Sequence, residues 1–245
     1  MNVLEVQGLA KRYPAFTLNG VSFAVPEGAV MGFIGRNGAG KSTTLKSILG
    51  MVHPDAGEVK VFGMDYAVNE RAIRRELGVV LGGIDFYPKK KIRVITDVTR
   101  RFYDNWDEDK YRHYLRLFVI DEEKRVDQLS SGMKVKYMIA IALSHNARLL
   151  ILDEPTSGLD PVSRDELTEL LRRLVADGTR SVLFSTHITS DLEKCATHIA
   201  FIKDGELQYT GSLDDFRTHY KDVGATLEDI IVHVERRPLD ESAII

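Results

Sequence analysis

A short segment of this chain combines glycine, lysine and serine at a spacing suited to binding phosphate. Residues 35–42 read GRNGAGKS and follow the apolar run Val30–Ile34. Glycines let several backbone N–H groups point at one anion, and the helix expected over Lys41–Leu49 adds the positive end of its dipole. Lys41 would bind the β- and γ-phosphates of a nucleotide, and the Ser42 hydroxyl suits Mg²⁺. The expected phosphate-binding residues are Gly35, Arg36, Asn37, Gly38, Ala39, Gly40, Lys41, Ser42 and Thr43.

Two carboxylates follow a second apolar run. Leu149–Leu152 reads as a buried strand, and Asp153 and Glu154 come directly after it. Ligands of open α/β sheets bind beyond the carboxyl ends of the strands, so these acids should meet the phosphate-binding segment. Asp153 is then a candidate to hold Mg²⁺, and Glu154 is placed to act as a general base toward water. Without the glycine-rich segment, the same pair would be read as two solvated acids.

Further segments carry a resemblance to one family. Residues 129–133, LSSGM, resemble the LSGGQ signature of ATP-binding-cassette (ABC) ATPases, from which Ser131 and Met133 depart. Residues 157–160, SGLD, resemble the D-loop of that family, and His187, in STH after an apolar run, resembles its switch histidine. Tyr13, upstream of the glycines, resembles the aromatic residue that stacks on adenine. The order and spacing of these segments cover nearly the whole chain, with features of the ABC-2-type exporter subgroup.

The resemblance implies a division of roles. Lys41, Glu154 and His187 would be catalytic, with His187 contacting the γ-phosphate of ATP. Ser42 and Asp153 would hold Mg²⁺. In the family, the signature segment closes over ATP bound by the opposite subunit of a head-to-tail dimer. That arrangement assigns nucleotide contacts to Tyr13, Ser130, Ser131, Gly132 and Asp160.

One position departs from the family pattern in a way that should affect the rate of ATP hydrolysis. The family usually has a glutamine after the strand expected over Leu77–Leu81, and Gly82 occupies that place. Glycine offers no side-chain oxygen to a metal ion, and the Gly82–Gly83 pair adds backbone freedom. We therefore expect slow ATP hydrolysis that still depends on Glu154.

The elements that must position these residues alternate between strands and helices, which predicts an α/β fold. We expect a P-loop NTPase core with a mostly parallel sheet, an N-terminal antiparallel β-subdomain and an inserted helical subdomain. The core would span residues 1–86 and 147–220, the helical insertion 87–146, and a short C-terminal extension 221–245. We expect a helix over Pro161–Ala176 that starts after Asp160, and Ser212 is the expected cap of a later short helix.

Composition narrows the class of protein. The chain of 245 residues carries 33 basic and 36 acidic side chains, a net charge of −3, which offers no general excess for binding nucleic acid. Its single cysteine excludes an intrachain disulfide and favours a reducing compartment. No apolar run approaches the ~20 residues that span a bilayer. We expect a peripheral protein at the cytoplasmic face of the cell membrane, in contact with the membrane through a partner.

Three weaker features leave alternatives open. The basic segment Lys89–Arg93 is either a solvated face or a contact for anionic lipid or a membrane partner. The aromatic residues Phe102, Tyr103 and Trp106 either pack in a core or line a groove for a partner helix. A helical stripe near the end packs on its own domain or adds to a dimer interface; it consists of Leu227, Ile230, Ile231 and Val234.

The sequence thus predicts the ATP-hydrolysing subunit of a membrane ABC transporter, an exporter whose expected cargo is a hydrophobic peptide or an antibiotic. Its partners would be a separate transmembrane permease subunit and a second, identical ATPase subunit. Two alternatives remain: an ABC ATPase acting in translation or repair, and a nucleotide-binding regulatory subunit with little hydrolysis. A single cassette and the limited length between Lys41 and Asp153 disfavour the first, and the presence of Glu154 and His187 disfavours the second.

Overall fold

The fold contains two sheets in the computed structural model, which describes residues 1–81 and 87–236. An antiparallel N-terminal sheet has the order β2-β1-β4-β5, formed by Phe16–Pro26, Asn2–Tyr13, Ala56–Val61 and Met64–Asp65. A larger sheet has the order β10-β9-β3-β8-β7-β6. Its strands are Glu206–Ser212, His198–Lys203, Val30–Ile34, Ser181–Thr186, Leu149–Asp153 and Leu77–Val80. Among the described strands of this second sheet, only the β10–β9 pair is antiparallel, so the predicted mostly parallel sheet is confirmed.

The larger sheet is buried on both faces. Every residue of β3, β7 and β8 is buried, as the unbroken apolar runs predict. Side chains alternate between two cores because successive strand residues point to opposite faces. Leu149, Ile151 and Leu183 belong to the core shared with the N-terminal sheet and helix α1 (Lys41–Ile48). Leu150 and Leu152 belong to the core on the other face, to which the helices from residue 92 onward contribute.

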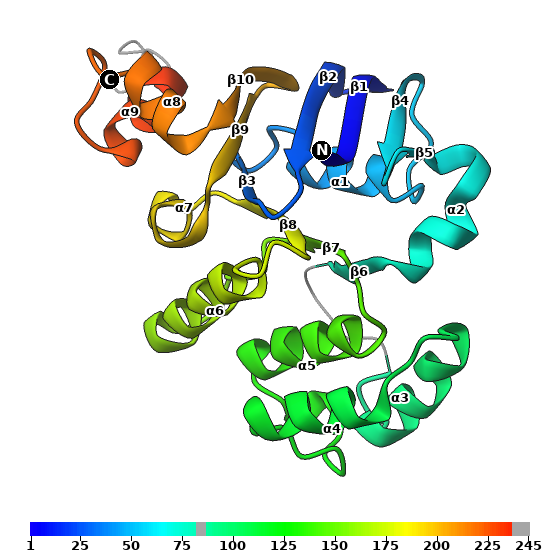
Figure 1. Cartoon of the computed structure of the whole chain (residues 1–245). Coiled ribbons are helices and arrows are strands. Elements are labelled where there is room, and N and C mark those ends of the chain that lie inside the picture. The colour runs from blue at the N-terminus through cyan, green and yellow to red at the C-terminus, as the bar shows by residue number, and fades with distance from the viewer. Residues whose placement is uncertain (82–86, 237–245) are drawn as a thin grey trace.

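A helical group lies between β6 and β7 in the chain. It comprises α3 (Ile92–Thr99), α4 (Glu108–Leu117) and α5 (Ser131–Ser144), with short 3-10 turns at Arg100–Phe102 and Val126–Gln128. Figure 1 shows this group at the end of the molecule opposite the N-terminal sheet. Thr96 ties the three helices together, because its hydroxyl lies 2.9 Å from the Tyr111 hydroxyl and 2.8 Å from that of Tyr137. The helical character expected for this stretch is therefore present, while the domain boundaries stay a prediction.

The C-terminal half adds helices around the same sheet. These are α6 (Pro161–Leu174), α7 (Thr189–Cys195), α8 (Leu213–His219) and α9 (Leu227–Glu235). Ser212 caps α8, as predicted, and α6 starts after Asp160, as predicted, with the Asp160 side chain as its cap. Leu227 and Ile230 of α9 are buried in the chain's own core, and Lys203 Nζ donates to the carbonyl of Val234 at 2.6 Å. The apolar stripe therefore packs on its own domain, and the chain needs no dimer contact to bury it.

Two helices were not expected from the sequence. Helix α2 (Tyr66–Arg75) buries only Tyr66 and Ile73 and is interrupted at Asn69 by non-helical backbone angles. Helix α7 is only seven residues long. Neither has the long apolar periodicity by which a helix is recognised in sequence.

Candidate nucleotide site

Three neighbouring strands deliver the candidate residues to one edge of the sheet. Strands β3, β8 and β7 are adjacent and parallel, with Ile34 paired to Thr186 and Asp153 paired to Ser185 in register. The phosphate loop leaves β3, His187 follows β8, and Glu154 follows β7. The carboxyl ends of these strands therefore bring together residues that lie far apart in the sequence, as doubly wound sheets do.

The phosphate loop connects β3 to the first residue of α1. Gly40, at its end, has φ of 113° and serves as the N-cap of α1. A methyl group at Gly40 would lie 2.8 Å from the Phe16 ring, so both conformation and space require glycine there. Lys41 is only 4% exposed. Its ammonium donates to the carbonyls of Gly35 at 2.7 Å and Arg36 at 3.2 Å, which folds the side chain back over the loop.

Ser185 holds the acidic pair in place. Its hydroxyl donates to Asp153 Oδ1 at 2.6 Å and accepts from the backbone N–H of Glu154 at 2.9 Å. Ser185 and Asp153 are both buried. A buried carboxylate is costly unless hydrogen bonds satisfy it, and this hydroxyl meets that need. Sequence analysis noted Ser185 only as a neighbour of His187; its part in orienting both acids follows from the pairing of β7 with β8.

Glu154 connects the two other candidate catalytic residues. Its Oε1 lies 3.1 Å from Lys41 Nζ, and its Oε2 accepts from His187 Nδ1 at 2.9 Å. The backbone of Glu154 has φ of 48°, in the left-handed region that is uncommon for residues other than glycine. Of the three residues predicted to be catalytic, Glu154 therefore contacts both of the others, Lys41 and His187.

A cavity of about 320 Å³ opens beside this group. Its lining includes the expected residues Asn37, Gly38, Ser42 and Thr43, together with Phe16. Tyr13 is not part of the lining; it lies opposite Phe16 across the β1–β2 turn and is 38% exposed. Phe16 is the residue that sequence analysis missed, although an aromatic side chain two residues beyond Pro14 could have indicated it. Adenine stacking by Tyr13 stays a prediction.

The donor set suits Mg²⁺ bound together with a nucleotide. Ser42 and Asp153 offer a hydroxyl and a carboxylate, both hard oxygen ligands. Among residues 1–81 and 87–236, no cluster of three His, Cys, Asp or Glu side chains could hold a metal ion by itself. Mg²⁺ characteristically takes one or two protein ligands and fills its remaining positions with waters and phosphate oxygens. The two predicted residues therefore fit a magnesium ion that arrives with the nucleotide.

The signature residues lie apart from the cavity that Lys41 lines. Ser130 caps α5 by accepting from the backbone N–H of Met133 at 3.2 Å. Ser131 Oγ donates to the carbonyl of Gly158 at 3.2 Å, which joins the start of α5 to the loop before α6. Asp160 ends that loop; its hydrogen bonds from Ser163 lower the pKa of its carboxyl. Within one chain, the segments form a second surface next to the start of α6. Gly82, the position without the family glutamine, lies outside the described residues.

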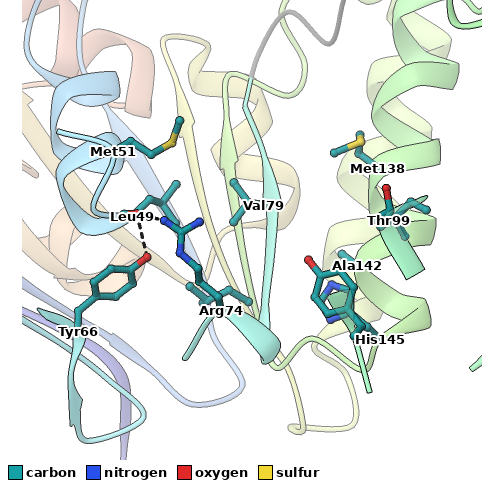
Figure 2. A pocket seen from close by; sticks show the side chains of 12 residues that line it. Leu49, Met51, Tyr66, Arg74, Val79, Thr99, Met138, Ala142 and His145 are labelled. Atoms are coloured by element: carbon teal, nitrogen blue, oxygen red, sulfur yellow. Dashed lines mark hydrogen bonds between the residues drawn. The ribbon is translucent and has the colours of Figure 1, made fainter. Parts of the chain in front are cut away.

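A second cavity, of about 230 Å³, lies where the helical group meets the core. Figure 2 shows Leu49, Met51 and Tyr66 on one side of it and Met138, Ala142 and His145 on the other, with Val79 between them. Arg74 and Tyr103 line both this cavity and an adjoining one of about 510 Å³. The adjoining cavity is rich in arginine and contains Phe102, which is 73% exposed; its other lining residues include Arg71, Arg75, Arg101, Glu70 and Asp104.

The structure separates the aromatic and basic features that the sequence left open. Tyr103 stacks on His145 with a centroid distance of 3.8 Å, and Trp106 packs in the core against Tyr111. Phe102 and Tyr103 line the arginine-rich cavity, whereas Trp106 does not. In the basic segment, Lys89 pairs with Asp127, and Lys91 and Arg93 both pair with Glu123. Acidic neighbours thus offset much of the charge of that segment.

Fold and site together define a phosphate-loop nucleotide-binding protein. The sequence pattern of the ABC transporter family matches residues 18–157. The bacitracin transport ATP-binding protein BcrA of Bacillus licheniformis is 32% identical over 208 residues, which cover 84% of this chain and 68% of that protein. The Nod factor export ATP-binding protein I of Burkholderia orbicola is 35% identical over 208 residues, covering 82% and 68%. The chain therefore belongs to the ABC transporter family and is an ATP-binding subunit of such a transporter.

Solved structures agree with this assignment. An ATP-binding subunit of an ABC transporter superposes with a TM-score of 0.84 at 30% identity, covering 96% of this chain and all of that chain (100%). A dimeric ATP-binding cassette in a post-hydrolysis state, bound to ADP and phosphate, superposes with a TM-score of 0.74. At 22% identity, covering 86% and 98%, the second comparison shows the fold alone. No helix in the described part of the chain is long and apolar enough to span a bilayer.

Proposed function

We propose that this chain hydrolyses ATP to drive a separate transmembrane subunit, and that it acts as an exporter component at the cytoplasmic face of the membrane. The observation that carries the hydrolytic part is the contact of Glu154 with both Lys41 and His187. A regulatory subunit that only bound nucleotide would have no need of a carboxylate and an imidazole held together beside the phosphate loop. The family alternatives in translation or repair gain no support from any described feature.

The chemistry assigns one role to each of the three residues. The Lys41 ammonium binds the β- and γ-phosphates and leaves Glu154 when they arrive, since both anions compete for it. Glu154 accepts a proton from the water that attacks the γ-phosphorus, while the bond from that phosphorus to the bridging oxygen breaks. The His187 imidazole donates from Nδ1 to Glu154, which orients the carboxylate. Mg²⁺, held by Ser42 and Asp153, would offset the charge on the phosphate oxygens.

The signature surface supports a head-to-tail dimer. Ser130, Ser131 and Gly132 begin α5, so their backbone N–H groups and the helix dipole form an anion-binding end. Because these residues lie apart from the chain's own phosphate loop, a second copy is the natural source of the γ-phosphate they would bind. Asp160, at the end of the neighbouring loop, would lie near the same boundary.

The arginine-rich cavity is the proposed docking site for the membrane subunit. It carries Arg71, Arg75 and Arg101 around the exposed Phe102, beside the apolar cavity of Figure 2. A short helix with acidic residues next to an apolar side chain would complement both cavities. Since α2 and β6 connect this region to the parallel sheet, a helix bound there would contact the elements that lead to the nucleotide site.

The direction of transport and the kind of cargo are inferred from named relatives. One relative is named for bacitracin transport and another for Nod factor export. We infer export of an amphipathic compound, with a hydrophobic peptide or peptide antibiotic as the first choice to test.

Hydrolysis and coupling need separate experiments. The purified chain should release phosphate from MgATP, and Glu154→Gln should abolish most of this release while still binding ATP. Equal rates for both proteins would contradict the proposed mechanism. Co-expression with a candidate membrane subunit, followed by purification from detergent, should yield a complex whose ATPase activity rises with cargo. Cargo-independent activity of such a complex would leave the hydrolytic part intact and refute the transport part.

A further inference from the structure

Asp191, in the first turn of α7, is a buried carboxylate that the hydrolytic scheme does not use. Its side chain is 0% exposed. Asp191 Oδ2 accepts a hydrogen bond from Thr156 Oγ1 at 2.6 Å and a longer one from Thr186 Oγ1 at 3.4 Å. Thr156 and Thr186 are themselves only 1% exposed. One oxygen atom thus joins two loops that are thirty residues apart in the chain (residues 156 and 186).

Each of these loops carries a residue of the proposed hydrolytic pair. Thr156 lies two residues after Glu154, and the N–H of Ser157 donates back to the Glu154 carbonyl at 3.1 Å. Thr186 precedes His187 directly, and its hydroxyl also accepts from the N–H of Ile188 at 3.0 Å. Asp191 therefore connects the segment that follows Glu154 to the residue that precedes His187. These are the two segments that bring His187 Nδ1 to Glu154 Oε2.

The second oxygen of Asp191 faces α6. Asp191 Oδ1 lies 4.0 Å from Arg164 Nε, and neither atom has a hydrogen-bond partner among the described residues. The N–H of Arg164 donates to the carbonyl of Asp160, the cap of α6. A small shift of α6 toward α7 would convert this ion pair into a hydrogen bond. Unsatisfied buried polar atoms are rare in folded proteins, and a pair so nearly in contact points to an element with two positions.

The same loop reaches the signature surface. Thr156 begins the segment that ends at Asp160, and Gly158 within it accepts from Ser131 Oγ. A displacement at the start of α5 or of α6 can therefore be transmitted to Asp191 through Thr156 or Arg164. From Asp191 it can be transmitted to His187 through Thr186.

We propose that Asp191 is a positioning residue, which sets the geometry of the Glu154–His187 pair according to the position of the loop formed by residues 156–160. This inference rests on the proposed ATPase function. Asp191 contacts no reacting atom. Asp191 instead acts on the two loops that carry Glu154 and His187. The pair would orient the attacking water only when the loop of residues 156–160 has the position that it takes in the dimer.

The primary test is Asp191→Asn, which keeps the size of the side chain and removes its charge. Steady-state hydrolysis is measured against ATP concentration, and rates are expressed per molecule that binds a fluorescent ATP analogue, so that misfolded protein is not counted. We expect KM within about twofold of the wild-type value and kcat about 10- to 100-fold lower, as misplaced catalytic groups produce. A wild-type kcat per binding molecule would overturn the proposal.

A second pair of variants remains decisive if Asp191→Asn does not fold. Thr156→Val removes the hydroxyl without changing the shape of the side chain, whereas Thr156→Ser keeps it. The valine variant should lose kcat and the serine variant should keep most of it; equal kcat values for the two would overturn the proposal. Asp165→Asn is the matched control, because Asp165 pairs with Lys194 across the same two helices at the surface, away from both threonines.

A double-mutant cycle separates positioning from general loosening of the structure. If Asp191 acts through His187, Asp191→Asn should cost little in a chain that already carries His187→Ala. Fully additive losses in kcat would overturn the proposal. Failure of the proposed function would look different, since wild-type hydrolysis would then be absent or independent of Glu154.

Discussion

The carboxylate of Glu154 lies 3.1 Å from the ammonium of Lys41, so the proposed general base and the proposed phosphate ligand are paired with each other. The pair is largely shielded from solvent, with Lys41 4% exposed and Glu154 23% exposed at the side chain. Nucleotide phosphates must compete with this carboxylate for Lys41. The proposed mechanism therefore gives Glu154 two opposing effects: its carboxylate would slow capture of the nucleotide and would then activate the water.

Glu154→Gln should separate these effects. We expect kcat to fall by about 10²- to 10⁴-fold, the usual contribution of a general base, because the amide cannot accept the proton from water. ATP should bind at least as tightly as to the wild type, because the competing charge beside Lys41 is gone. Phosphate release and equilibrium binding of ATP are the two measurements. A variant with weaker ATP binding would contradict the competition, and Glu166→Gln, on the surface of α6, is the control for loss of an acidic side chain.

Ser185→Ala should destabilise the chain and impair hydrolysis. The change leaves a buried Asp153 oxygen and the Glu154 N–H without the hydroxyl that joins them. Loss of a partner for a buried polar group costs about 1–3 kcal/mol in the free energy of unfolding. Chemical denaturation measures this cost. Ser144→Ala is the comparison, since the buried Ser144 hydroxyl donates to the carbonyl of Ala140 in its own helix; an equal loss for both variants would contradict a special role for Ser185.

Gly40→Ala should prevent nucleotide binding. The added methyl group meets the Phe16 ring at 2.8 Å, in a backbone conformation that alanine rarely adopts, so the phosphate loop must move. Gly63→Ala is the matched control, because Gly63 also has positive φ but open space around it. Calorimetric titration with ATP should show loss of binding for the first variant only. Normal affinity for Gly40→Ala would mean that the loop geometry is not required.

His145 should make stability depend on pH in the acid range. Burial lowers the pKa of its imidazole to about 4, below the value of about 6.5 in an unfolded chain. The folded chain therefore binds fewer protons between these values, so stability is fully present above about pH 6.5 and falls as the pH drops toward 4. Urea unfolding at pH 7.5 and pH 5 measures the change.

The variant His145→Phe should reduce that change, because it keeps a ring beside Tyr103 and removes the titrating group. His113→Gln, at an exposed position, should behave as the wild type does. A pH dependence that survives in His145→Phe would assign it to other groups.

Phe102→Ala and Arg101→Glu should uncouple the chain from its membrane subunit. Both residues line the proposed docking cavity and are exposed at the surface. ATP hydrolysis by the isolated chain should remain within about twofold of the wild type, because surface substitutions away from a site change little. Co-purification with the membrane subunit should decline. Leu117→Ala, another exposed apolar position on the helical group, is the control; equal losses for Leu117→Ala and Phe102→Ala would contradict this docking site.

Local chemistry made much of the site predictable. The phosphate loop, the helix that starts after Asp160 and the strand ending in Asp153 each depend on residues that are close together in the sequence. Such features are visible in a sequence because each is marked by a residue that the backbone requires, such as glycine at the positive φ of Gly40, or by an unbroken apolar run. The placement of the acids beside the phosphate loop was also predictable, because parallel strands end at the same edge of the sheet. The contact of Glu154 with His187 was not predicted and is a finding of the structure.

Other features depend on distant pairing, which a single sequence does not display. Lys91 and Arg93 looked like a basic surface, yet Glu123 pairs with both from beyond the next helix. Phe16 enters the cavity because the turn at Pro14 places it across from Tyr13. Helix α2 was missed because it buries so little apolar surface. In each case the deciding contact is made by the tertiary structure.

The left-handed backbone of Glu154 has a consequence for how the chain can change. For residues other than glycine, such a conformation costs of order 1–3 kcal/mol. The proposed general base therefore occupies a position where glycine would be less strained. Selection for thermal resistance alone would favour glycine or asparagine at this position and would discard hydrolysis. A directed-evolution experiment that selects only for thermal stability should therefore accumulate substitutions at residue 154, and these variants should not hydrolyse ATP.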